Sequence, residues 1–160
     1  SIRRQRQMCI RDSTGCSSND GPAAGYRHFR QQDVDLLTPL VGAVLGKALT
    51  DVGASAEDGM KAYDDLLDGA MPGTRATLFQ ILDLMQLGAA RWFITGTWAS
   101  FAEQSEDELQ QTLAHWSSSD RGLSRMAFKG LTQPMFMAWY VKPEAARSTG
   151  YPGPPQKIVA

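Results

Sequence analysis

The sequence has few of the residues on which catalytic and metal sites most often depend. It contains two cysteines and two histidines in 160 residues, and neither His28 nor His115 has a cysteine or carboxylate cluster beside it at a metal-ligand spacing. It also lacks a glycine-rich dinucleotide fingerprint, a phosphate-binding loop and a nucleophile elbow. We therefore expect no metal ligand, no cofactor-binding residue and no catalytic residue in this chain.

An excess of one charge and a long apolar run are lacking as well. The chain carries 16 basic and 17 acidic residues, for a formal net charge of −1, and it has no basic stripe of the kind that binds nucleic acid. Its longest apolar runs, near residues 36–49 and 89–94, are interrupted by Lys47 and Arg91 and are too short to span a bilayer. We expect no nucleic-acid partner and no transmembrane helix.

Residues 1–28 are expected to form a non-globular leader. Residues 1–13 show no helical or strand periodicity, and the string from Arg6 to Ser13 resembles translated sequencing-adapter sequence, so we interpret this part as an artefact. The alternative is a twin-arginine export signal at Arg3 and Arg4. Such a signal needs an apolar core after its charged part, and none follows here.

The segment from residue 14 to 25 resembles the processing site and tether of a bacterial lipoprotein. Gly15 precedes Cys16, and a polar stretch rich in serine, asparagine, aspartate and glycine follows. This order suits an acylated thiol at a membrane joined to a folded body by a polar tether. Cys16 is therefore a candidate lipidation site, and an ordinary exposed cysteine is the alternative.

Residues 29–160 are expected to form a single all-α domain, a compact bundle of about five to six helices followed by a tail rich in proline and glycine. Apolar residues recur at helical spacing, and no segment alternates cleanly with period two. The expected helices run over about 31–49, 56–68, 74–93, 105–116 and 120–139, with a short one from Pro143.

Local signals mark the ends of these helices. Ser55 with Asp58, and Ser105 with Glu108, have the spacing of capping boxes, and Ser119 or Asp120 is expected to cap the last long helix. Pro134 is expected to kink that helix. Beyond Pro143, Gly150 fits the left-handed position just past a helix end.

The C-terminal half holds more aromatic and methionine side chains than one small core needs. Such side chains are enriched at the centres of interfaces, and arginines can pair with a partner's carboxylates. The alternative is that most of them fill the domain's own core. The candidate partner-interface residues are Trp98, Phe101, Trp116, Arg121, Arg125, Met135, Phe136, Met137, Trp139, Tyr140 and Tyr151.

The same half carries an ordered set of residues that resembles a known family. Phe101, Ser105 and Glu108 are followed by Leu113 and Trp116, and then by Arg121, Arg125, Phe128 and Leu131. The aromatic helix end at Trp139-Tyr140 leads to Pro143-Glu144 and to the run Gly150-Tyr151-Pro152-Gly153-Pro154-Pro155. From about Thr95 to Gln156 this pattern resembles the gluconate 2-dehydrogenase subunit 3 family, the small subunits of flavin-dependent dehydrogenases of the glucose-methanol-choline type.

The resemblance implies a noncatalytic subunit in the periplasm, anchored to the inner membrane if Cys16 carries lipid. Such a subunit binds a large flavin-dependent catalytic subunit, helps it to mature and aids its export; the FAD lies in that partner, and a cytochrome c subunit can complete the complex. The alternative is an independent periplasmic helical lipoprotein or adaptor that binds a peptide or lipid. A third possibility, an autonomous enzyme, has no nucleophile, base pair or metal cluster to support it.

Overall fold

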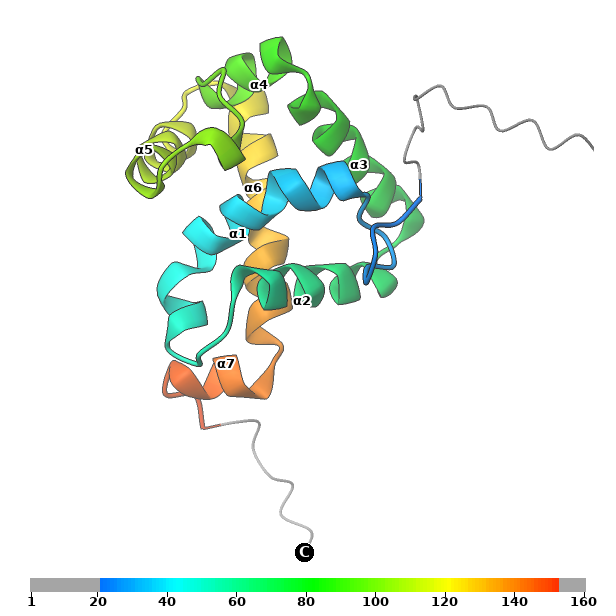
Figure 1. The fold of residues 1–160 in the computed structure, drawn as a ribbon, viewed down its shortest axis with the longest axis vertical. Helices are drawn as coiled ribbons and strands as arrows, with labels where there is room; N and C mark the ends of the chain where they lie inside the picture. Colours follow the sequence, from blue (N-terminus) through cyan, green and yellow to red (C-terminus); the bar gives the residue numbers. More distant parts are fainter. Residues whose placement is uncertain (1–20, 153–160) are drawn as a thin grey trace, which may run out of the picture.

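The computed structural model describes residues 21–152, and these residues confirm the predicted all-α class (Figure 1). Within this range there are seven α-helices, one short 3-10 turn and no strand. The predicted lipidation site, Cys16, lies outside the described residues. The helices are α1 (Gln31–Thr50), α2 (Ala56–Asp68), α3 (Pro72–Gln86), α4 (Gly88–Thr95), α5 (Glu106–Ser117), α6 (Gly122–Tyr140) and α7 (Pro143–Ser148), with the 3-10 turn η1 (Phe101–Glu103) between α4 and α5.

Helix α6 runs through the middle of the molecule, and the other helices are arranged around it (Figure 1). Both α1 and α2 cross it, α3 and α4 continue along one side and over one end, and α7 lies at the opposite end. The core between these helices is formed by large side chains that are almost completely buried, including Leu37, Leu40, Met60, Leu82, Leu131 and Met135.

The closest helix contact joins α1 to α2 at Gly59. A Cβ atom added at Gly59 would lie 2.6 Å from Cγ1 of Val41, which is shorter than any normal carbon contact, and 3.4 Å from Cδ1 of Leu45. Glycine is therefore required here, because any side chain would push the two helices apart. The apolar faces of α1 and α2 consequently meet with almost no exposed surface between them.

Both predicted capping boxes are present. The Ser55 N–H donates to Asp58 at 2.9 Å, and the Ser105 N–H donates to Glu108 at 2.8 Å. These backbone donors and the two serine hydroxyls hold the pKa values of Asp58 and Glu108 below their usual range. The starts of α2 and α5 agree with the sequence prediction for this reason. The short helix from Pro143 and the left-handed Gly150, with φ of 82°, are also confirmed.

Three helix predictions need correction. The helix expected over 74–93 is two helices, because Leu87 adopts an extended backbone (φ −83°, ψ 116°) and separates α3 from α4. Helix α6 starts at Gly122 after Arg121, so neither Ser119 nor Asp120 is its cap. The helix expected to run unbroken over about 31–49 bends at Gly46 (φ 22°, ψ −99°). The split at Leu87 accounts for one helix more than the sequence predicted.

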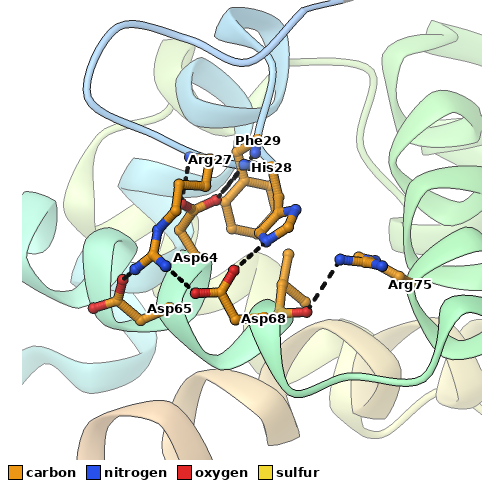
Figure 2. Close-up of polar contacts among 8 residues, drawn as sticks. Arg27, His28, Phe29, Asp64, Asp65, Asp68 and Arg75 are labelled. Carbon is orange, nitrogen blue, oxygen red and sulfur yellow. Dashed lines mark hydrogen bonds and ion pairs between the residues drawn. The ribbon is translucent and has the colours of Figure 1, made fainter.

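The segment before α1 is bound to α2 through one buried carboxylate (Figure 2). Asp64 accepts hydrogen bonds from three successive backbone N–H groups, those of Arg27 at 2.6 Å, His28 at 3.0 Å and Phe29 at 3.1 Å. Phe29 is thereby held in the core, where its ring meets that of Tyr63 edge to face at 5.1 Å. The folded body accordingly includes Arg27 and His28, which the sequence analysis assigned to the leader.

Exposed ion pairs surround this anchor. Arg27 pairs with Asp65 at 2.5 Å and also with Asp68, which His28 Nε2 contacts at 2.7 Å. These partners hold the pKa of the Asp68 carboxyl below its usual range, with the His28 hydrogen bond as the largest cause. Figure 2 also shows Arg75 of α3 donating to the Leu67 carbonyl at 3.5 Å, which ties the end of α2 to the next helix.

A second buried carboxylate fixes the start of α1. Asp33 is fully buried and accepts from Arg30 Nε at 2.8 Å and from Arg30 Nη2 at 3.0 Å. The same guanidinium reaches Asp83 of α3 at 2.6 Å and lies 5.4 Å from the centre of the Phe79 ring. The Asp33 hydrogen bond is the main cause that raises the pKa of Arg30 above its ordinary value, so the guanidinium stays charged.

We expect Asp64→Asn to lower the free energy of unfolding by about 2 kcal/mol, because the amide nitrogen would face a backbone N–H and leave it buried without an acceptor. Urea denaturation followed by circular dichroism measures this change. Asp65→Asn on the same helix is the matched control; it removes only an exposed ion pair and should cost less than about 0.5 kcal/mol. Equal effects of the two substitutions would contradict the anchoring role of Asp64.

Candidate functional site: an exposed aromatic surface

Three large aromatic side chains lie on the outside of the molecule at α4 and the loop that follows it. Trp92 is 44% exposed, Phe93 48% and Trp98 61%. The indole rings of Trp92 and Trp98 stack with their centres 5.6 Å apart and an angle of 19° between their planes. Together with Arg121, whose guanidinium lies 5.1 Å from the Phe93 ring centre, these residues form what we call the α4 aromatic surface.

Hydrogen bonds to the backbone hold this surface in place. Arg91 donates from Nη2 to the Trp98 carbonyl at 2.7 Å and from Nη1 to the Met85 carbonyl at 3.0 Å, so one guanidinium links the end of α3 to the loop that carries Trp98. Arg121 Nη1 donates to the Phe93 carbonyl at 3.0 Å. The aromatic side chains are thus positioned before any partner binds, which reduces the entropy cost of binding.

The turn between α4 and Trp98 depends on Gly96. Its φ of 85° is in the left-handed region, where a residue with a side chain is strained, and a Cβ added there would lie 2.9 Å from Cδ2 of His115. Gly96 therefore lets the chain reverse directly against α5. The His115 side chain is exposed to solvent on its outer side, and the backbone of this turn packs against it.

Further apolar side chains are exposed at the ends of the neighbouring helices. Leu87 at the junction of α3 and α4 is 60% exposed, and Leu123 and Met126 in the first turns of α6 are 54% and 70% exposed. The end of α3, helix α4 and the beginning of α6 lie at the same end of the molecule (Figure 1). Exposed apolar groups gathered in one place are typical of a surface that binds another molecule.

Four of the predicted interface residues lie in the core and are corrected here. Phe101 and Trp116 are fully buried, and their rings stack with centres 6.0 Å apart. Met135 and Trp139 are 1% and 3% exposed. The burial of Met135 and Trp139 has a common cause: α6 is packed by other helices on several sides, so more of its circumference is covered than a helix with a single buried face would allow.

The indole nitrogens of the two buried tryptophans are both satisfied. Trp116 Nε1 donates to the Ser124 carbonyl at 3.0 Å, and Trp139 Nε1 donates to the Ala48 carbonyl of α1 at 3.3 Å. Buried indoles need such acceptors. These two residues are therefore fitted to the core and cannot serve as direct contacts with a partner.

The other predicted interface residues are exposed, in two separate places. Trp98 and Arg121 belong to the α4 aromatic surface, and Arg125 is exposed one turn further along α6. At the far end of α6 the structure exposes a second group, which consists of Phe136, Met137, Tyr140 and, after α7, Tyr151.

Sequence reasoning missed Trp92 and Phe93 as surface residues. Both residues fall in the single helix expected over 74–93, since helical spacing continues past Leu87. The available signal was that two large aromatic residues adjacent in sequence point in directions about 100° apart on a helix, so a narrow buried stripe cannot accommodate both.

Glu103, in the turn that follows Trp98, serves as a helix cap. Glu103 accepts from the Ser100 N–H at 2.8 Å, and this bond, together with the serine hydroxyl, holds the pKa of Glu103 below its usual range. Residues 21–152 hold no group of three or more histidine, cysteine, aspartate and glutamate side chains placed to bind a metal ion. Within the same range, none of the helices combines the length and the apolarity needed to cross a membrane.

The structure defines an all-α domain with a preformed aromatic surface at one end. No family model, no curated protein and no solved structure matches this chain. The aromatic surface and the sequence resemblance are therefore the two supports for a functional proposal.

We expect Gly96→Ala to lower the free energy of unfolding by about 1–2 kcal/mol, because the left-handed backbone is strained for alanine and His115 must move. Gly122→Ala is the control: no atom lies within 4 Å of an added Cβ there, so stability should be unchanged or slightly higher. Thermal unfolding of both variants measures the difference. If Gly96→Ala left the free energy of unfolding unchanged, the constraint on the turn before Trp98 would be contradicted.

Proposed function

We propose that this protein is a noncatalytic subunit that binds a large flavin-dependent dehydrogenase of the glucose-methanol-choline type. The observation that carries the proposal is the α4 aromatic surface, on which two tryptophans, a phenylalanine and an arginine are exposed yet held in position. The resemblance of residues 95–156 to the small subunits of such dehydrogenases supports this choice of partner.

The composition of the surface favours a protein partner. Tryptophan, tyrosine and arginine are the residues that most often dominate the free energy of protein–protein binding, above all when they are surrounded by other apolar groups. Trp92, Trp98 and Arg121 meet this description, and Leu87, Leu123 and Met126 supply exposed apolar surface near them. Arg125 is placed to pair with carboxylates at the edge of such an interface.

The second exposed group offers a further contact in the same complex. Phe136, Met137 and Tyr140 lie at the far end of α6, and Tyr151 follows α7. Tyr140 and Tyr151 of this group belong to the residues that carry the resemblance to the family. A partner that reached both ends of α6 would contact the helix termini while the buried side of α6 stayed in the core, which is the pattern expected of a subunit that helps a larger protein to fold.

The location and the partner's chemistry follow from the same proposal. We place the complex in the periplasm, with the FAD and the hydride transfer in the large subunit and with a cytochrome c subunit as a further component. The role of this chain is then to aid maturation and export of the large subunit and to remain bound to it. Acylation of Cys16 would hold the complex at the inner membrane.

We expect Trp98→Ala to weaken binding to the flavin-dependent dehydrogenase about 30-fold, since loss of a central aromatic contact costs about 2 kcal/mol. The experiment is to express residues 17–160 with a tag beside the flavin oxidoreductase encoded by the adjacent gene and to isolate the complex. Its yellow flavin absorbance and its stoichiometry identify the partner, and calorimetric titration compares the variants.

The control for this experiment is Met71→Ala, which removes an apolar side chain that is 75% exposed and lies between α2 and α3. It should bind like the unmodified protein. A well-folded, colourless protein that elutes alone would contradict the subunit proposal and favour the independent adaptor. Equal weakening by both substitutions would contradict the α4 aromatic surface as the docking site.

Lipidation is tested separately, by mass spectrometry of the protein isolated from its own host. We expect the mass of the mature chain to correspond to cleavage before Cys16 and addition of a diacylglycerol group, and we expect Cys16→Ser to release the protein from membranes. An unmodified Cys16 thiol in the native protein would remove the lipoprotein hypothesis and leave the binding proposal intact.

A further inference from the structure

Helix α6 has one side that stays exposed along most of its length. After the first turn its exposed residues are Arg125, Met126, Lys129, Gln133, Phe136, Met137 and Tyr140. At 3.6 residues per turn, all of them fall within an arc of about 120° of the helix circumference. They form one continuous surface about 22 Å long, since residues three and four positions apart on a helix are neighbours.

Five of these residues form a stripe of the kind along which two helices pack. Met126, Lys129, Gln133, Phe136 and Tyr140 are separated by alternating intervals of three and four positions. This average spacing of about 3.5 residues keeps a stripe facing a second helix that lies nearly along the first. Its apolar members Met126, Phe136 and Tyr140 are 70%, 41% and 38% exposed, so no helix of the described chain fills this place. We call these five residues the α6 stripe.

The charges within and beside the α6 stripe are all positive. Lys129 belongs to the stripe and Arg125 adjoins it, and neither forms an ion pair with any residue that the structure describes. From residue 121 to residue 143 the sequence contains no aspartate or glutamate. By contrast, Lys61 on α2 pairs with Glu57 at 2.8 Å. The α6 stripe therefore offers two free cations among exposed apolar side chains.

Hollows on both flanks make the far half of the α6 stripe a ridge. Phe136 and Tyr140 line a hollow of about 670 Å³ that also borders on α1 and α5. On the other flank, Pro134 and Met137 line a hollow of about 550 Å³ between α2, α3 and α6. The side chains of a protein partner can enter such hollows on both sides of a ridge, whereas the even surface of a membrane cannot.

We propose that an acidic amphipathic helix of the large flavin-dependent subunit packs along the α6 stripe, with one carboxylate opposite Lys129 and a second within reach of Arg125. This inference rests on the proposed function, since the helix belongs to that partner. Arg125 and Lys129 are one helical turn apart, so carboxylates one turn apart on the partner helix match them.

Charge decides between this occupant and a second copy of the chain. Covering a cation without pairing it costs free energy, so the segment that covers the α6 stripe has to supply acidic groups. Two copies packed stripe to stripe would bring together basic residues alone. Charge therefore disfavours a dimer through this surface and favours an acidic partner.

The first experiment locates the partner helix by photo-cross-linking. The full chain with p-benzoylphenylalanine in place of the exposed Gln133 is combined with the dehydrogenase encoded by the adjacent gene, irradiated, and digested for mass spectrometry. We expect one cross-linked segment of the large subunit, with helical apolar spacing and acidic residues one turn apart. The same photoreactive residue in place of Met71, between α2 and α3, is the matched control and should not capture that segment.

The second experiment tests the charge pairing. We expect Lys129→Glu to raise the Kd for the dehydrogenase at least about tenfold, because it replaces an attraction by a repulsion, and we expect a smaller effect at high salt. Lys61→Glu makes the same change of charge on the exposed side of α2 and should leave the Kd unchanged. Replacing an acidic residue of the captured segment by lysine should restore binding to Lys129→Glu. Both lysines are exposed, so circular dichroism should show both variants folded.

The possible failures of this inference and of the proposed function differ. A complex that forms equally well with Lys129→Glu, or a cross-link from position 133 to a basic or extended segment, would overturn the inference and leave the proposed function intact. Absence of any complex with the dehydrogenase would overturn both. Binding of the full chain to phosphatidylglycerol vesicles that Lys129→Glu abolishes would also overturn the inference, because it would assign the α6 stripe to a membrane surface.

Discussion

The contact between α1 and α2 at Gly59 is the constraint on which the rest of the structure depends. Because no side chain fits between Gly59 and Val41, the two helices lie close enough for their apolar faces to merge into one core. This fixes the rotation of α2 about its axis. Asp64 then faces the segment before α1, whose backbone it binds, and Tyr63 lies against Phe29 in the core.

The central position of α6 explains where apolar side chains are free and where they are not. Leu131, Met135 and Trp139 lie on the sides of α6 that other helices cover, so they are core residues. Met126 near its start and Met137 near its end lie on other sides of the helix and are exposed. The exposed apolar side chains of α6 are near its two ends, and one of these ends is completed by α4, whose own aromatic residues point outward.

Local sequence signals were sufficient to predict those features of the backbone that depend only on neighbouring residues. Both serine-initiated helices, the short helix at Pro143 and the left-handed Gly150 were predicted correctly, because a cap or a positive φ involves residues only a few positions apart. The α3–α4 break was missed since the apolar spacing runs through Leu87, and the glycine directly after it, Gly88, did not interrupt that spacing. At this break the Arg91 guanidinium binds the carbonyls of Met85, near the end of α3, and of Trp98.

The sequence by itself determined that this protein is built from helices, where most of them begin, and which residue types are available for binding, since periodicity and capping are local properties. Tertiary structure decided which of those residues are used. Phe101 and Trp116 lie in the core and Trp92 lies on the surface, because burial depends on which helices pack together. That packing is set by contacts such as Gly59 with Val41 and Asp64 with the backbone at Arg27. These contacts join residues far apart in the sequence, and no local pattern encodes them.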